Sequence, residues 1–216
     1  MRVLVLAAHL DDVSLTMWIR LQQHILIGDE VFVHGFFGSS KVHTEIVSDD
    51  VDAFYRSMSI LWVKKAFTSM CLLPPINDGG YEDVWREMRT LFKTCCPDIL
   101  YTHFPKDLHR DHEVISQEAL VAAWSVPSVI YFTSPGTHHF RPTMIALWTP
   151  QMLQNKLVAM RCFSEQHYIT EMLDELPVHS AWLLLEHLPH ELLYKRQQEG
   201  KDYFAELFCV ERMVQF

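Results

Sequence analysis

The stretch Val3-Leu4-Val5-Leu6-Ala7-Ala8-His9-Leu10-Asp11-Asp12 begins as an unbroken apolar run and ends among polar side chains. A short apolar run of this kind is typical of a strand buried on both faces of a parallel sheet. Ligands of such sheets bind outside the carboxyl ends of the strands. We therefore expect His9, Asp11 and Asp12 to lie at a functional edge of an α/β domain.

Four more strand-like runs follow, separated by helix-like segments. The predicted strands cover residues 3–8, 31–37, 66–70, 98–103 and 128–133, and the predicted helices cover residues 14–27, 48–62, 81–95 and 112–124. Gly28 suits the end of the first helix. This alternation predicts an α/β, Rossmann-like fold with a mainly parallel sheet and helices on both faces.

The last third of the chain has a weaker pattern. Residues 138–148 are expected to include a peripheral strand, residues 150–166 and 181–198 to be helical, and residues 203–210 to form a final strand or short helix. The sequence shows no internal repeat, low-complexity tract or linker. Residues 1–216 are therefore expected to form a single domain.

Composition excludes several classes of partner. Lysine and arginine number 18 against 27 acidic residues, a formal charge of −9, and the basic residues are scattered. Such a chain is not expected to bind nucleic acid or an anionic membrane. No apolar run reaches the roughly 20 residues of a membrane-spanning helix, and strand-like sequence from Val3 onward leaves no room for a signal peptide. The five cysteines lack C-x-x-C spacing, which predicts reduced thiols and a cytoplasmic protein.

A second polar cluster, Asp107-Leu108-His109-Arg110-Asp111-His112, follows the predicted strand at 98–103. Both clusters thus lie at the carboxyl ends of strands, where the topology brings them together. A catalytic zinc site typically has three protein ligands and one open position. We expect His9, Asp12 and His112 to be these ligands, although iron(II) and other divalent ions also suit such a set.

The neighbouring side chains suit acid–base roles. Asp11, adjacent to a ligand, is expected to take the proton of the attacking water. His109 faces the same way as His112 if a helix begins there, and is expected to polarise the substrate carbonyl or to protonate the leaving amine. Asp111 or Asp107 is expected to hydrogen-bond to His109. Taken alone, paired aspartates also suit a helix cap and H-x-x-H a helix surface, so the prediction depends on both clusters.

The two clusters resemble motifs of the LmbE/PIG-L-like N-acetylglucosaminyl deacetylases. The family's A-H-P-D-D-E is matched by Ala8–Val13, and its P-x-D-x-H-x-D-H by Pro105–His112. The similarity extends to residues 156–166 and 203–208, which resemble the family's K-x-x-A-L-x-x-H-x-S-Q and Y-A-E-x-F. It thus covers nearly the whole chain.

The resemblance implies a Rossmann-like zinc enzyme that removes acetate from the 2-acetamido group of an N-acetylglucosamine conjugate, a small-molecule substrate. Such an enzyme is a carbon–nitrogen hydrolase acting on linear amides. The implied roles are zinc ligation by His9, Asp12 and His112, general base for Asp11, and oxyanion stabilisation for His109. We also place Asp111 in the catalytic set and Asp107 among the substrate-binding residues. The sequence is compatible with a homo-oligomer.

The chain departs from the family pattern in two places. Leu10 replaces the usual proline and Val13 the usual glutamate. Where relatives often carry arginine or lysine, this chain has Asp49, Asp50 and Asp52, which favours a neutral or cationic sugar over an anionic one. Two alternatives stay open: an amidase of the same fold acting on a different acyl group, and a non-catalytic sugar-binding domain.

Overall fold

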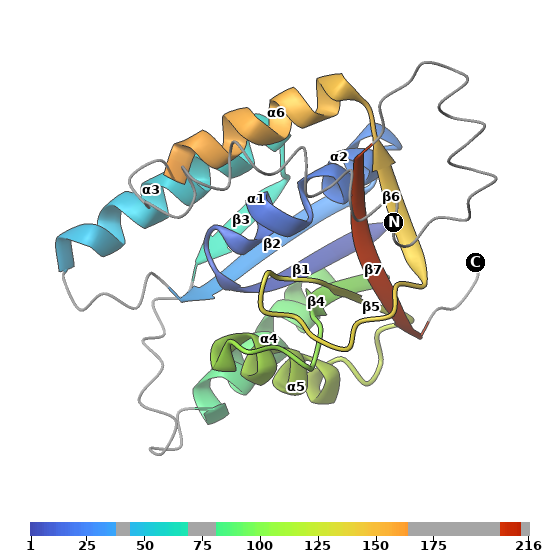
Figure 1. Cartoon of the computed structure of the whole chain (residues 1–216). Coiled ribbons are helices and arrows are strands. Elements are labelled where there is room, and N and C mark those ends of the chain that lie inside the picture. Colours follow the sequence, from blue (N-terminus) through green and yellow to red (C-terminus); the bar gives the residue numbers. More distant parts are fainter. Residues whose placement is uncertain (38–43, 69–80, 164–203, 213–216) are drawn as a thin grey trace.

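A seven-stranded sheet forms the centre of the molecule, with strand order β3-β2-β1-β4-β5-β7-β6 (Figure 1). The computed structural model describes residues 1–37, 44–68, 81–163 and 204–212. The strands are β1 (Arg2–His9), β2 (Glu30–Phe37), β3 (Lys65–Thr68), β4 (Ile99–His103), β5 (Ser128–Phe132), β6 (Met144–Trp148) and β7 (Phe204–Arg212). The first five strands are parallel, and β7 runs antiparallel between β5 and β6. The expected α/β, mainly parallel, Rossmann-like arrangement is confirmed.

Helices cover both faces of this sheet, as predicted. They are α1 (Asp12–Thr16), α2 (Trp18–Leu26), α3 (Thr44–Leu61), α4 (Tyr81–Cys95), α5 (Arg110–Ala122) and α6 (Pro150–Met160), followed by a 3-10 turn at Arg161–Phe163. Helices α1, α2, α3 and α6 lie on one face, and α4 and α5 lie on the other (Figure 1). No helix in this described part of the chain is long and apolar enough to span a lipid bilayer. The helix predicted over residues 181–198 lies outside the described residues.

Strand β1 explains the apolar run at the start of the chain. Val3 and Val5 pack into the core under α1, α2, α3 and α6, whereas Leu4 and Leu6 pack into the core under α4 and α5. All four side chains are fully buried. A strand covered on both faces shows no alternation of polar and apolar residues, which is why its sequence is continuously apolar.

The sheet order places a topological switch point between β1 and β4. Strands β2 and β3 extend the sheet on one side of β1, and β4 and β5 extend it on the other. The ladder of β1 with β2 continues to His9 and Phe37, but the ladder with β4 ends at Val5 and Tyr101. Beyond Val5 the two central strands no longer pair, and ligand sites of open α/β sheets form at this position.

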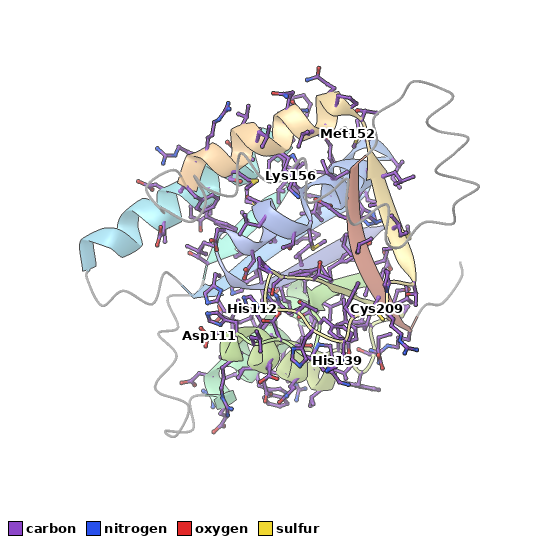
Figure 2. The ribbon with its side chains drawn as sticks, in the orientation of Figure 1. Asp111, His112, His139, Met152, Lys156 and Cys209 are labelled. Atoms are coloured by element: carbon purple, nitrogen blue, oxygen red, sulfur yellow. The ribbon has the colours of Figure 1, made fainter. Side chains whose placement is uncertain are left out.

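The single helix predicted over residues 14–27 is instead two helices, α1 and α2. Glu206 of β7 accepts hydrogen bonds from the backbone N–H groups of Ile19 (3.1 Å) and Arg20 (3.0 Å), at the start of α2. The ammonium group of Lys156, on α6 (Figure 2), donates to the same carboxylate at 2.8 Å. Both side chains of this ion pair are buried. A carboxylate at a helix N-terminus satisfies N–H groups that lack partners within the helix, so this distant residue fixes where α2 begins.

Candidate metal centre

The first polar cluster occupies the turn between β1 and α1. His9 ends β1, and Asp12 begins α1. The carboxylate of Asp12 turns back and accepts the backbone N–H of His9 at 2.7 Å. Asp11 stands at the N-cap position, yet its side chain makes no capping hydrogen bond. Both aspartates are 5% exposed. Capping of α1 therefore does not explain why an aspartate stands at position 11, because its carboxylate is buried and caps no backbone N–H group.

The second cluster occupies the turn between β4 and α5. Helix α5 begins at Arg110, with His109 as the N-cap residue whose Nδ1 accepts the N–H of Asp111 at 3.3 Å. The rings of His109 and His112 lie with centroids 4.7 Å apart, on the same side of the helix as predicted. Figure 2 shows Asp111 and His112 at the start of α5, on the face of the sheet opposite α6.

The two clusters meet at the switch point. Nδ1 of His9 lies 3.2 Å from Nε2 of His112 and 3.4 Å from Oδ2 of Asp12, and Oδ1 of Asp12 lies 3.4 Å from the same His112 nitrogen. Two groups of three side chains place ligand atoms within 4.8 Å of one another and could hold a metal ion: His9, His109 and His112, and the buried set Asp12, His103 and His112.

Asp107 lies behind His112 and does not face the open side of the centre. Its side chain is fully buried, and its Oδ1 lies 3.3 Å from Nδ1 of His112 and accepts the N–H of His109 at 2.8 Å. Its Oδ2 accepts the hydroxyl groups of Ser134 and Thr137. Burial raises its pKa, but the adjacent imidazole of His112 and the hydrogen bonds from Ser134 and the His109 N–H outweigh burial and lower it. The sequence predicted that Asp107 contacts the substrate. Its buried position beside His112 instead favours a role in orienting the His112 ring.

Asp111 lies closer to His9 than to His109. Its Oδ2 is 3.1 Å from Nε2 of His9 and 3.8 Å from Nδ1 of His109. The expected hydrogen bond from a carboxylate to the His109 ring is therefore wrong for both candidates, because Asp107 faces His112 and Asp111 faces His9. Each imidazole of the pair His9 and His112 thus has a carboxylate behind the nitrogen that faces away from the centre. This is the usual arrangement around histidines that bind metals.

The two central aspartates have opposite electrostatic environments. Burial, followed by the negative charge of Asp12, raises the pKa of Asp11 to about 7, and Asp50 of α3 adds to this effect. Burial would also raise the pKa of Asp12, but the imidazoles of His103 and His9 outweigh it and hold that pKa well below its usual range. One carboxylate thus favours its charged form, whereas the other can exchange a proton near neutral pH.

The imidazoles differ in the same way. Burial lowers the pKa of His9, but Asp12 and Asp111 raise it to about 10, and in His112 the carboxylates of Asp107 and Asp12 overcome burial to give about 9. Metal binding at these rings therefore competes with their protonation. His109 has a lowered pKa because of burial and the neighbouring imidazoles. With Nδ1 accepting a backbone N–H, neutral His109 carries its proton on Nε2.

Three features of the centre were not predicted from the sequence. His103, the last residue of β4, is fully buried against Asp12 and His112. Ser134 and Thr137, from the loop after β5, hold Asp107. The sequence does carry a signal for His103, because a histidine at the end of a predicted strand, just before the second polar cluster, lies at the edge of the sheet where the site forms. The loop residues carry no such signal, since only the fold brings them to Asp107.

Solved structures of deacetylases share this fold. A teicoplanin deacetylase in a zinc-inhibited form matches with a TM-score of 0.68 and 16% identity, over 98% of this chain and 99% of that chain. N,N′-diacetylchitobiose deacetylase from Pyrococcus horikoshii matches with a TM-score of 0.67 and 17% identity, over 96% and 82% of the chains. The chain thus has the fold of the LmbE-like deacetylases, as the two motifs predicted.

The same fold also carries other chemistry. The 4-carboxy-2-hydroxymuconate hydratase GalB from Pseudomonas putida matches with a TM-score of 0.74 and 15% identity, over 100% of this chain and 99% of that chain. No protein-family model matches the sequence, and no curated protein matches it. At these identities the comparisons establish the fold, and the reaction must be argued from the site.

Proposed function

We propose that this protein is a zinc-dependent N-deacetylase that removes acetate from an N-acetylated amino sugar in a small glycoconjugate. We assign the metal to His9, Asp12 and His112. The carrying observation is the closeness of their polar atoms: Nδ1 of His9 lies 3.2 Å from Nε2 of His112, and the two oxygens of Asp12 lie 3.4 Å from one of these nitrogens each. Ligands about 2.0–2.1 Å from a tetrahedral zinc lie roughly 3.3–3.4 Å apart, which is close to each of these pairwise distances.

Ring orientation supports this set over the other two histidines. The lone pair of an imidazole nitrogen lies in the plane of its ring, so two parallel stacked rings cannot aim at one ion. The rings of His103 and His112 are stacked at 9°, and those of His109 and His112 at 23°. The rings of His9 and His112 are inclined at 57°. Nε2 of His103 is also occupied, because it accepts the backbone N–H of Ala8 at 3.0 Å.

The remaining groups supply the acid–base chemistry of amide hydrolysis. A bound divalent ion here would polarise the amide carbonyl and make a water molecule more acidic. Asp11 takes the proton of the attacking water, since its raised pKa suits exchange near neutral pH, and it returns this proton to the leaving amine when the carbon–nitrogen bond breaks. His109, with a side chain that is 51% exposed, offers its Nε2 proton to the developing oxyanion. Asp107 and Asp111 hold His112 and His9 in orientation.

The proposed substrate class combines the resemblance with the charge of the site. Two of the matched proteins are deacetylases of a glycopeptide antibiotic and of diacetylchitobiose. Asp50 is 7% exposed and lies within electrostatic reach of Asp11, which adds negative charge beside the proposed base. We therefore favour a neutral or cationic amino sugar. The side chain of Asp49 lies outside the described residues.

The test is acetate release from N-acetylglucosamine conjugates by metal-free protein, with and without added zinc, iron(II) or cobalt(II). Metal-restored release supports the proposal. Asp11→Asn is expected to bind metal but to lose activity by about 10²–10⁴-fold, whereas His112→Ala is expected to lose both properties. Near-full activity of Asp11→Asn would contradict the assignment of the base.

The same panel distinguishes the alternatives. Release of longer acyl groups without release of acetate indicates an amidase of different specificity. Addition of water to an unsaturated acid, with no amide cleavage, indicates a hydratase. Failure to bind any of the three metals indicates a non-catalytic domain.

A further inference from the structure

His103 occupies the place where the two central strands stop pairing. It is the last residue of β4 and is fully buried. The ladder between β1 and β4 has already ended at Val5 and Tyr101, so Ala8 cannot use it. Instead, Ala8 donates its backbone N–H to Nε2 of His103 at 3.0 Å. A side chain thus replaces the missing backbone acceptor between β1 and β4.

The same imidazole contacts each of the segments that carry the proposed ligands. Its ring lies parallel to that of His112, with centroids 4.0 Å apart. Its Nε2 lies 3.2 Å from Oδ2 of Asp12. Its contact with Ala8 is one residue from His9. Phe132 of β5 packs against the ring at 4.4 Å, so the imidazole cannot move away from His112 without displacing the core.

The hydrogen bond from Ala8 indicates the tautomer of the His103 ring. Because Nε2 accepts from Ala8, it has no proton to give to Asp12, whose Oδ2 accepts the N–H of His9 instead. With Nε2 as the acceptor, a neutral ring carries its proton on Nδ1. Nδ1 has no hydrogen-bond partner within residues 1–37, 44–68, 81–163 and 204–212.

An unpartnered buried polar atom costs about 1–3 kcal/mol. Phenylalanine or leucine would fill the same space without that cost. Packing alone therefore does not account for a histidine at this position. A histidine is accounted for by its two contacts, because it accepts the N–H of Ala8 and presents a flat ring to His112.

We infer that His103 is a positioning residue that sets the spacing of the metal ligands without binding the metal itself. Its Nε2 fixes the end of β1 beside His9, and its ring face fixes the plane of His112. This inference rests on the proposed metal site but not on the identity of the substrate. Groups that orient metal ligands typically change metal affinity by about 10–100-fold when they are removed.

Two substitutions separate the two contacts. His103→Phe keeps a flat ring against His112 and removes the acceptor for Ala8. His103→Gln keeps a carbonyl acceptor and removes the ring. We expect each variant to bind zinc about tenfold or more weakly in a chelator competition, and to alter the visible absorption spectrum of the cobalt(II) form.

His24→Phe provides the matched control. His24 is also buried, at 1% exposed, and its ring nitrogens are hydrogen-bonded to Asp29 and Tyr101, away from the metal centre. This variant is expected to lose stability in thermal unfolding but to keep zinc affinity and the cobalt spectrum. If the His24→Phe variant loses stability but keeps its zinc affinity, a loss of stability alone cannot explain weaker zinc binding in the His103 variants.

Three outcomes overturn the inference. Wild-type zinc affinity and cobalt spectrum in both His103 variants show that the residue only packs. An equal loss of affinity in His24→Phe shows a general effect of stability. Complete loss of metal in His103→Phe, with metal retained in His9→Ala, makes His103 a ligand. Failure to find a hydrolysed amide leaves these measurements unaffected, so it counts against the proposed function alone.

Discussion

Gly136→Ala is expected to disturb the metal centre from a loop that contributes no ligand. A Cβ atom at this position would lie 2.6 Å from Oδ1 of Asp107, whereas an ordinary contact begins at 3.4 Å. The carboxylate must therefore move by about 0.8 Å. The backbone at Gly136 is outside the left-handed region, so alanine introduces no backbone strain. The whole effect should pass through Asp107.

The displaced oxygen is the one that faces His112 and accepts the N–H of His109. A hydrogen bond to a charged group contributes about 1.5–3 kcal/mol, and we expect Gly136→Ala to lose part of it, about 1–2 kcal/mol in the free energy of unfolding. Because Asp107 orients a proposed ligand, zinc affinity should fall by about tenfold. Urea denaturation and chelator competition measure the two quantities.

A double-mutant cycle tests the route of the effect. In an Asp107→Ala background no carboxylate remains for the new methyl group to displace, so Gly136→Ala should change zinc affinity by less than about twofold. Two results would refute the reasoning. One is wild-type affinity in Gly136→Ala, and the other is an undiminished loss in the Asp107→Ala background.

Activity should fall as the pH drops, because Asp11 gains a proton and can no longer act as the base. A bound dication lowers the pKa of Asp11 from about 7 towards its ordinary value, so the midpoint of the fall should lie between about pH 4 and 7. A pH–rate profile that stays flat down to pH 4 contradicts this. Asp50→Asn should improve kcat/KM for a phosphorylated sugar relative to its neutral counterpart by roughly fivefold, about 1 kcal/mol, whereas the exposed Asp52→Asn should not. Equal effects of the two variants exclude a specific role. Lys156→Met should lower the free energy of unfolding by about 3 kcal/mol, because it leaves the Glu206 charge buried without its partner; a loss below about 1 kcal/mol in urea denaturation contradicts this.

The sequence predicted the features that depend on local pattern and on general topology. The apolar run from Val3 gives a buried strand, and parallel strands place their polar ends along one edge of the sheet. The convergence of His9, Asp12 and His112 follows from these two facts. Which nitrogen of each ring faces the centre does not follow, because it depends on the positions of Asp107 and Asp111.

The errors concern residues whose environment comes from distant segments. The pattern over residues 14–27 fits one helix, and only Glu206, from the far end of the sequence, explains the break between α1 and α2. His103 looked like an ordinary strand residue because its partner, the N–H of Ala8, is exposed only where β1 and β4 separate. The sequence predicted a strand or short helix over residues 203–210 but not its place in the sheet. That place, between β5 and β6, is set by tertiary packing.

The place of β7 has a consequence for the order in which the chain is assembled during synthesis. All the proposed metal ligands and acid–base residues precede Glu113, and the five parallel strands are complete at Phe132. Strand β6 pairs with β7, so it must wait for the segment from Phe204 before it can join the sheet. Until then the edge of β5 is open, and an open strand edge can pair with another nascent chain. The segment that closes this sheet is therefore also its protection against aggregation.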